Sequence, residues 1–212
     1  MSLRKEKSAR LKVHILEQTL KHVGKKPFED LYVEEICDKV KISKVTFFKY
    51  FPQKEDLLMY FLRVCCLHRI VELRDKPKEG LQGIYYLFEM AGEEYEQHPG
   101  MMLSMVGYMA DMKRAIKPFP IKPEEKELLY PNVADIQQVE IQSLEQMFEK
   151  FTLEAIFKRE ITKTTATRDI TNLLMSNLLG SIIIAHTNQI SSPKVFFRRN
   201  LEWLLKGLQG NP

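Results

Sequence analysis

The 212-residue chain has few cysteines and no long apolar run. Its three cysteines are too few for a disulfide framework, which excludes the class of small disulfide-rich secreted domains. The longest apolar candidate, 173–185, is interrupted by Ser176, Asn177, Gly180 and Ser181 and is shorter than the roughly 18 residues of a membrane span. The N-terminus is charged at once and has no apolar signal core. We therefore expect a cytoplasmic protein that does not enter a membrane.

The sequence also lacks the motifs of common enzymes. It has no His-Glu-x-x-His, no phosphate-loop Gly-Lys-Ser/Thr and no Gly-x-Ser-x-Gly. None of its five histidines follows a Glu at the spacing of di-iron bundles. We therefore expect no enzyme, no metal site and no cofactor. A redox or metal role for Cys65 and Cys66 stays open, although adjacent side chains on a helix point about 100° apart.

Positive charge is concentrated near the N-terminus. Residues 1–60 contain 13 Lys/Arg against 9 Asp/Glu, which accounts for the whole net charge of +4. Within 1–26 there are 8 basic and 2 acidic residues. A basic arm of this kind suits a polyanion such as DNA, and a solvated tail is the alternative.

Helical spacing dominates the chain, and it predicts an all-α fold of about nine helices. The expected helices cover 11–23, 33–40, 44–51, 54–76, 81–97, 101–115, 124 or 133 to 159, 168–189 and 193–208. Ser43 is a suitable N-cap for the third helix, and Pro52 ends it. We expect a three-helix DNA-binding domain at 1–53 and a helical effector-binding and dimerisation domain at 54–212.

Residues 33–57 read as two short helices, a tight turn and the start of a third helix. The second helix carries Lys44, Thr46, Lys49 and Tyr50, which suit phosphates and base edges. This pattern is typical of a helix-turn-helix that enters a DNA major groove. A helical interaction module with a vestigial helix-turn-helix, or a helical-bundle enzyme, remain the alternatives.

The order of these motifs resembles the tetracycline-repressor (TetR) family of transcriptional regulators. The resemblance is carried by Val33, Ile36, Val40, Ile42-Ser43, Thr46-Phe47-Phe48-Lys49-Tyr50-Phe51 and Lys54-Glu55-Asp56-Leu57-Leu58. The chain departs from the family pattern at Tyr32, Lys41, Val45 and Phe48, where the family usually has Thr, Gly, Gly and Tyr. The resemblance implies that Lys54 contacts a DNA phosphate and that a homodimer reads a pseudo-palindromic operator.

We expect the DNA contacts at Lys41, Ser43, Lys44, Val45, Thr46, Phe48, Lys49, Tyr50 and Lys54. The middle helices are rich in Met and aromatic residues, which suit a pocket for a small apolar or aromatic effector. The predicted pocket residues are Tyr85, Phe88, Met102, Met105, Met109 and Met112. The predicted dimer residues, implied by the family's use of its last two helices, are Leu174, Leu178, Ile182, Phe197, Leu201 and Leu204. The family default is a repressor, whereas the sequence leaves the effector, the operator and an activator role open.

Overall fold

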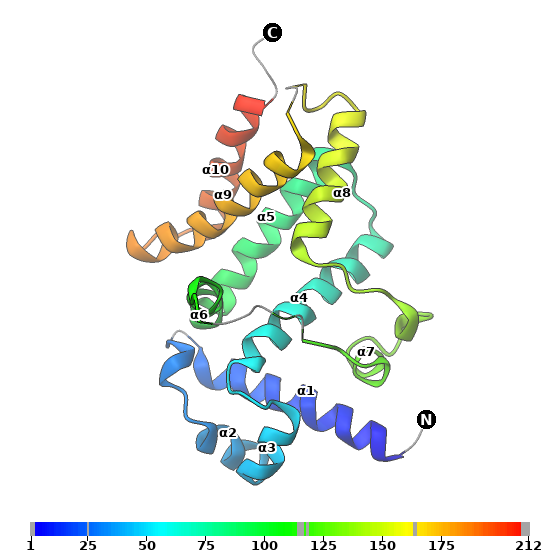
Figure 1. The fold of residues 1–212 in the computed structure, drawn as a ribbon, viewed down its shortest axis with the longest axis vertical. Coiled ribbons are helices and arrows are strands. Elements are labelled where there is room, and N and C mark those ends of the chain that lie inside the picture. Colours follow the sequence, from blue (N-terminus) through cyan, green and yellow to red (C-terminus); the bar gives the residue numbers. More distant parts are fainter. Residues whose placement is uncertain (1–2, 25, 114–116, 118, 163–164, 209–212) are drawn as a thin grey trace. The chain divides into compact units, whose positions relative to one another are not determined.

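The computed structural model describes residues 3–24, 26–113, 117, 119–162 and 165–208, and every regular element within these ranges is helical. This confirms the predicted all-α fold, with ten α-helices and two 3-10 turns among the described residues in place of about nine helices (Figure 1). The elements are α1 (Leu3–Val23), η1 (Phe28–Asp30), α2 (Val33–Val40), α3 (Lys44–Tyr50), α4 (Asp56–Asp75), α5 (Gly80–Gln97), α6 (Pro99–Ala110), α7 (Pro123–Leu129), η2 (Ile136–Gln138), α8 (Leu144–Phe157), α9 (Thr167–Thr187) and α10 (Pro193–Leu208).

The chain divides into two compact units. Unit 1 comprises residues 1–71 and 98–141, and unit 2 comprises 72–97 and 142–212. This division differs from the predicted boundary after residue 53. The reason is that α2 and α3 are too short to bury a core of their own, so Tyr60 and Phe61 of α4 and Met101 of α6 are buried in unit 1 as well.

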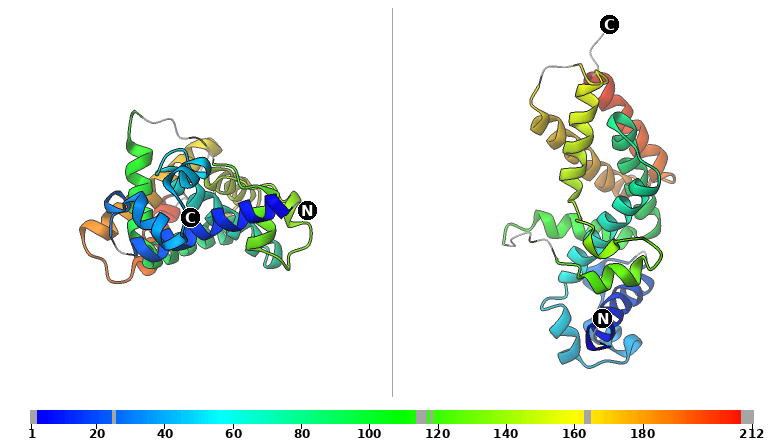
Figure 2. Two further views of the ribbon diagram at one scale, coloured as in Figure 1. Left: turned by 90° about the horizontal axis from the view of Figure 1, so that it is seen from below. Right: turned by 90° about the vertical axis from the view of Figure 1, so that its right-hand side faces the viewer.

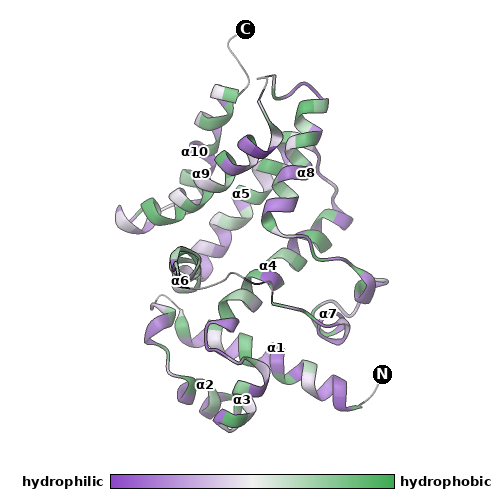
Figure 3. Cartoon of the chain, viewed as in Figure 1, coloured by the Kyte–Doolittle hydropathy of each residue, from purple (hydrophilic) through white to green (hydrophobic). Residues whose placement is uncertain are grey.

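In unit 1, α1 packs against α2 and α7, and α2 packs against α3 (Figure 2). The buried face of α1 includes Ile15, Leu16 and Val23, as its apolar spacing predicts. The helix begins at Leu3, eight residues before the predicted start, so residues 3–10 of the basic arm are helical as well. Its first turns are hydrophilic (Figure 3).

In unit 2, α5 packs against α8 and α10, and α9 packs against the same two helices. The core includes Phe88, Phe148 and Phe197, each at 0% exposure. Helix α9 is 21 residues long, and the mean hydropathy of its most apolar window reaches 1.3, the level of a possible membrane span, with 39% of that window buried in the structure. One side of α9 thus forms part of the unit's core.

The prediction of one long helix from residue 124 or 133 to residue 159 is wrong, because the structure has α7, η2 and α8 there. Helix α7 ends before Pro131, whose ring disfavours helical geometry at the preceding residue and removes a backbone donor. Helix α8 has its own start, where the Ser143 hydroxyl accepts the Gln146 N–H at 3.1 Å and the Gln146 side chain accepts the Ser143 N–H at 2.7 Å. The helix predicted to end at Ala115 ends at Ala110, and residues 114–116 lie outside the described ranges.

Candidate nucleic-acid interface

Ser43 fixes the start of α3. Its hydroxyl accepts the Thr46 N–H at 3.2 Å and lies 3.0 Å from the Thr46 hydroxyl. Its backbone is extended, with φ −79° and ψ 155°, as an N-cap requires. The predicted cap is thereby confirmed, and a helix of seven residues obtains a definite first turn.

One side of α3 is anchored in the core and the opposite side faces solvent. Phe47 and Phe51 are at 0% exposure, with ring centroids 5.8 Å apart. Val45 is 82% exposed, Phe48 is 43% exposed, and Lys49 is exposed as well. Because the buried phenylalanines set the rotation of the helix, the outward side is presented as a fixed surface.

Lys44 is held by an ion pair with Glu34 of α2, the helix that precedes the turn. The hydrogen bond from Lys44 lowers the pKa of the Glu34 carboxyl below its usual value. About half of each side chain remains exposed, at 54% and 53%, so solvent screens the pair. A phosphate that approaches Lys44 therefore competes with Glu34 for its ammonium group.

The turn between α2 and α3 contains Lys41 in the left-handed region, with φ 59° and ψ 50°. An L-residue with a Cβ is strained there, whereas glycine is not. The Ile42 N–H donates to the Cys37 carbonyl at 3.0 Å and closes the turn. Lys41 thus stands where family members usually have Gly, and it places an exposed cation beside α3.

The start of α2 does not use the side chain of Tyr32, which is 70% exposed. Instead the Tyr32 N–H donates to Glu35 Oε2 at 2.9 Å, and this bond lowers the pKa of the Glu35 carboxyl. A carboxylate from within the helix thereby caps α2, so the Thr that the family usually places at this position is not needed for the cap.

Lys54 lies before α4. The sequence predicts that this residue contacts a DNA phosphate. Its ammonium group donates to three backbone carbonyls, those of Phe28 at 3.2 Å, Glu29 at 2.9 Å and Leu31 at 2.9 Å. It also lies 4.9 Å from the centroid of the Phe28 ring. An ammonium group has three donors, so this geometry uses all of them within the subunit. Lys54 therefore joins the start of α4 to the segment that leads into α2.

A link between α6 and η1 has no counterpart among the predicted site residues. The buried Ser104 hydroxyl accepts the Phe28 N–H at 3.1 Å and donates to Glu29 Oε2 at 2.6 Å. One turn earlier, Gly100 lies so close to the Lys26 carbonyl that a Cβ would overlap it. In the sequence this link is marked only by a small residue and a serine four positions apart on α6, and many ordinary core contacts share that pattern.

The predicted effector residues fall into both units. In unit 2, Tyr85 lies under the Arg198 guanidinium at 5.5 Å, and Phe88 is fully buried with its ring 5.7 Å from that of Phe148. Burial raises the pKa of the Tyr85 hydroxyl. Unit 1 holds Met102, Met105, Met109 and Met112. The first two of these are buried, whereas Met112 is 100% exposed beyond the end of α6.

The predicted dimer residues are mostly core residues of unit 2. Exposure is 0–2% for Leu174, Leu178, Ile182, Phe197 and Leu201, and only Leu204 is partly exposed. A side chain buried within its own subunit has no surface left for a partner, which corrects the choice of these five. Their spacing along α9 and α10 identified an apolar face, and that face packs inward.

Two short helices, a tight turn, a core-anchored second helix and an outward side with cations define a helix-turn-helix DNA-binding protein. Residues 15–60 match the family described as bacterial regulatory proteins, tetR family. This segment therefore carries the DNA-binding helix-turn-helix of TetR-family regulators. No curated protein matches the chain.

Solved structures resemble the chain over almost its whole length. A TetR transcriptional regulator from Rhodococcus sp. RHA1 is 16% identical, with a TM-score of 0.55 over 92% of this chain and 96% of that one. GusR from Salmonella enterica is 20% identical, with a TM-score of 0.54 over 93% and 96%. At these identities the likeness is one of fold.

Proposed function

We propose that the chain acts in the cytoplasm as a homodimeric repressor that binds a pseudo-palindromic operator until a small apolar or aromatic effector releases it. The outward side of α3 carries this proposal: 82% of Val45 is exposed on a helix whose other side is fixed by Phe47. Val45 and Thr46 are short enough to approach base edges, whereas Lys41, Lys44, Lys49 and Tyr50 suit the phosphate backbone. One such helix buries too little surface for tight specific binding, so two copies read two half-sites.

The exposed apolar residues of α9 and α10 support the dimer. Leu173 and Ile184 are 45% and 43% exposed on α9, and Trp203 is 62% exposed on α10. Gly180 lies between the first two, and no atom lies within 4 Å of the position its Cβ would take, so a partner helix can approach there. We assign the dimer contact to this surface, which gives the apolar side of α9 a protein partner rather than a membrane.

Unsatisfied polar atoms in the core of unit 2 support a ligand-responsive unit. Within the described residues, no hydrogen-bond partner is found for the Thr152 hydroxyl, the Thr171 hydroxyl or Asn177 Oδ1. Buried polar atoms normally have partners, and ligand sites combine apolar walls with a few such groups. An effector lowers DNA affinity only to the extent that it binds the released state better.

Selection from a pool of random duplexes tests the DNA-binding part. We expect recovery of an inverted repeat that is bound at least about a thousandfold more tightly than unrelated DNA of the same length. Weak binding without sequence preference would instead support the interaction module with a vestigial helix-turn-helix. The complete absence of DNA binding would leave the helical-bundle enzyme as the remaining alternative.

Effector release is tested by a thermal-shift screen of small apolar and aromatic compounds against the full chain. A compound that raises the melting temperature is then titrated into the complex with the selected duplex. We expect the duplex to dissociate. If the complex stays equally tight at saturation with every stabilising compound, the release scheme fails.

A further inference from the structure

The segment between α6 and α8 folds onto unit 1. We call residues 119–141 the strap; it contains α7 and η2. Lys126 closes the strap on itself, because its ammonium group donates to the carbonyls of Val139 at 2.6 Å and Gln137 at 3.2 Å. Ile121, Ile136 and Ile141 of the strap are buried. The strap is therefore an ordered part of unit 1, with its own packing.

An aromatic contact joins the strap to the end of the recognition helix. The Phe119 ring stacks on the Phe51 ring, with centroids 5.5 Å apart and planes at 19°, and it meets Tyr60 edge-on at 5.8 Å. Phe51 is the C-cap of α3, and its N–H donates to the Phe47 carbonyl at 3.0 Å. Phe119 thus packs directly on the residue that ends α3, from a segment almost seventy positions later in the chain.

A buried ion pair holds the strap in this position. Lys12 Nζ of α1 lies 3.0 Å from both carboxylate oxygens of Glu125 and donates to the Pro120 carbonyl at 3.1 Å. The two charged residues are 5% and 1% exposed. The ammonium group also lies 4.4 Å and 4.7 Å from the centroids of the Tyr60 and Phe119 rings. Separation of this buried pair would leave each charge alone in the interior, which costs a large amount of free energy.

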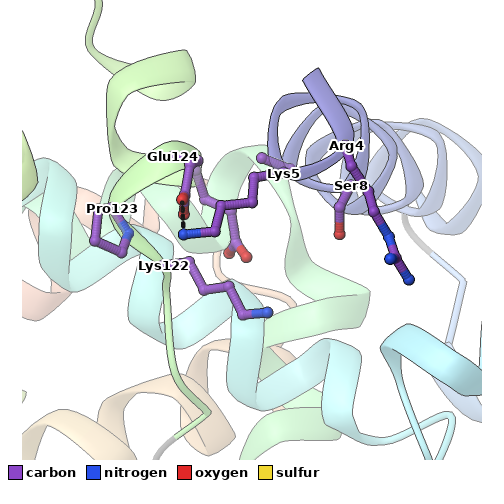
Figure 4. Close-up of a pocket in the computed structure, with 8 residues that line it drawn as sticks. Arg4, Lys5, Ser8, Lys122, Pro123 and Glu124 are labelled. Carbon is purple, nitrogen blue, oxygen red and sulfur yellow. Dashed lines mark ion pairs between the residues drawn. The ribbon is translucent and has the colours of Figure 1, made fainter. Parts of the chain in front are cut away.

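The rim of the contact is polar. Figure 4 shows the N-terminal turns of α1 beside the start of α7, where Lys5 and Glu124 form an ion pair at 3.5 Å. Lys5 is largely exposed at 71%, so this outer pair is screened and adds little. The interior contacts of Phe119 and Glu125 therefore determine the position of the strap.

We infer that the strap belongs to the DNA-binding domain and that Phe119 is a positioning residue, which sets the orientation of α3. The Phe119 ring stacks on the Phe51 ring, and the ion pair of Lys12 and Glu125 holds Phe119 against α1. Because Phe119 packs on the fully buried Phe51, away from the exposed Val45, we expect it to make no contact with DNA. The DNA-binding domain therefore extends beyond the contiguous N-terminal helices. This inference rests on DNA reading by α3 and does not depend on an effector.

Phe119→Leu and Phe119→Ala in the full chain test the inference. Hydrogen exchange of the free protein needs no DNA, and we expect exchange at residues 44–51 to rise about tenfold, the effect of losing one aromatic pair. With a selected duplex, we expect specific affinity to fall about tenfold. We expect affinity for random-sequence duplex to fall much less, because contacts to phosphates depend less on the orientation of α3 than contacts to bases do, and the salt dependence should stay the same, because no cation is removed. Phe157→Ala is the matched control, since this ring on α8 is 89% exposed, and it should change none of these quantities.

Two results would overturn the inference. One is a folded Phe119→Ala protein with wild-type exchange at residues 44–51. The other is an equal rise in exchange throughout unit 1, with specific and random affinity lowered alike, because that pattern marks a general loss of stability. If the Ala variant does not fold, the Leu variant, which keeps an apolar side chain, decides between the same outcomes. Failure to select any operator would contradict the proposed function but leave the exchange result interpretable.

Discussion

Lys54 Nζ donates to the Leu31 carbonyl at 2.9 Å, which ties the start of α4 to the residue before the N-cap of α2. Lys54→Met keeps most of the side chain and removes the donors. We expect the free energy of unfolding to fall by roughly 1–3 kcal/mol and exchange near residues 31–35 to rise. DNA affinity should fall while the salt slope stays the same.

A phosphate contact would behave differently. If Lys54 neutralised a phosphate, its loss would flatten the slope of log K against log salt by about one. Lys49→Met is the matched comparison, since that exposed cation on α3 should flatten the slope without lowering stability. Equal slope changes for the two variants would contradict the positioning role of Lys54.

Glu34→Gln should strengthen DNA binding. The wild type must separate Lys44 from Glu34 before a phosphate can take the ammonium group, and the variant removes that competition and one negative charge near DNA. Because both side chains are half exposed, we expect a gain of about twofold to fivefold in affinity, measured by fluorescence anisotropy. An unchanged or weaker affinity would show that Lys44 stays outside the interface.

The same pair gives a pH dependence with a definite sign. Because the folded-state pKa of Glu34 is lowered from 4.5, the pair stabilises the wild type above this pH, and the contribution is lost as pH falls through the lowered value. The small stability difference between the wild type and Glu34→Gln should therefore shrink on acidification.

Lys41→Gly should separate stability from binding. Glycine adopts the left-handed turn without strain, so we expect the free energy of unfolding to rise by about 0.5–1 kcal/mol in urea titration. If Lys41 contacts the DNA backbone, affinity and salt slope should fall together. Lys41→Asn removes the same charge with a smaller gain in stability. Raised stability with an unchanged salt slope would show that Lys41 does not contact the DNA backbone.

Trp203→Glu and Ile184→Glu test the dimer surface. A Trp at the centre of an interface commonly contributes 2 kcal/mol or more, so we expect the dimer dissociation constant in sedimentation experiments to rise about thirtyfold or more. Phe157→Glu changes an even more exposed apolar site, 89% exposed on α8, and should leave the dimer intact. Leu201→Ala should instead destabilise the subunit, because that side chain is fully buried. Dimers that survive both glutamate substitutions would locate the interface elsewhere.

The sequence predicted what depends on local spacing. The periodicity of Val33, Ile36 and Val40, the cap at Ser43 and the inward pair Phe47 and Phe51 specified the helix-turn-helix, because each signal acts within one or two turns. The apolar face of α9 was also recognised, but periodicity cannot distinguish a face that packs within the subunit from one that meets a partner.

Long-range contacts were not predictable in this way. Glu125 and Phe119 lie more than a hundred and almost seventy positions from their partners Lys12 and Phe51, and no local pattern connects them. The family resemblance led to the expectation that Lys54 contacts a DNA phosphate. The carbonyls that surround it converge only once η1 has folded.

Val45→Asp measures the central claim most directly. Val45 is the second residue of α3, where an acidic side chain favours the helix, so the melting temperature should stay the same or rise. The carboxylate would face the DNA, and we expect affinity for the selected duplex to fall at least about tenfold. Leu153→Asp on α8, 53% exposed, is the control and should bind normally. Wild-type affinity of a folded Val45→Asp protein would show that α3 does not read DNA.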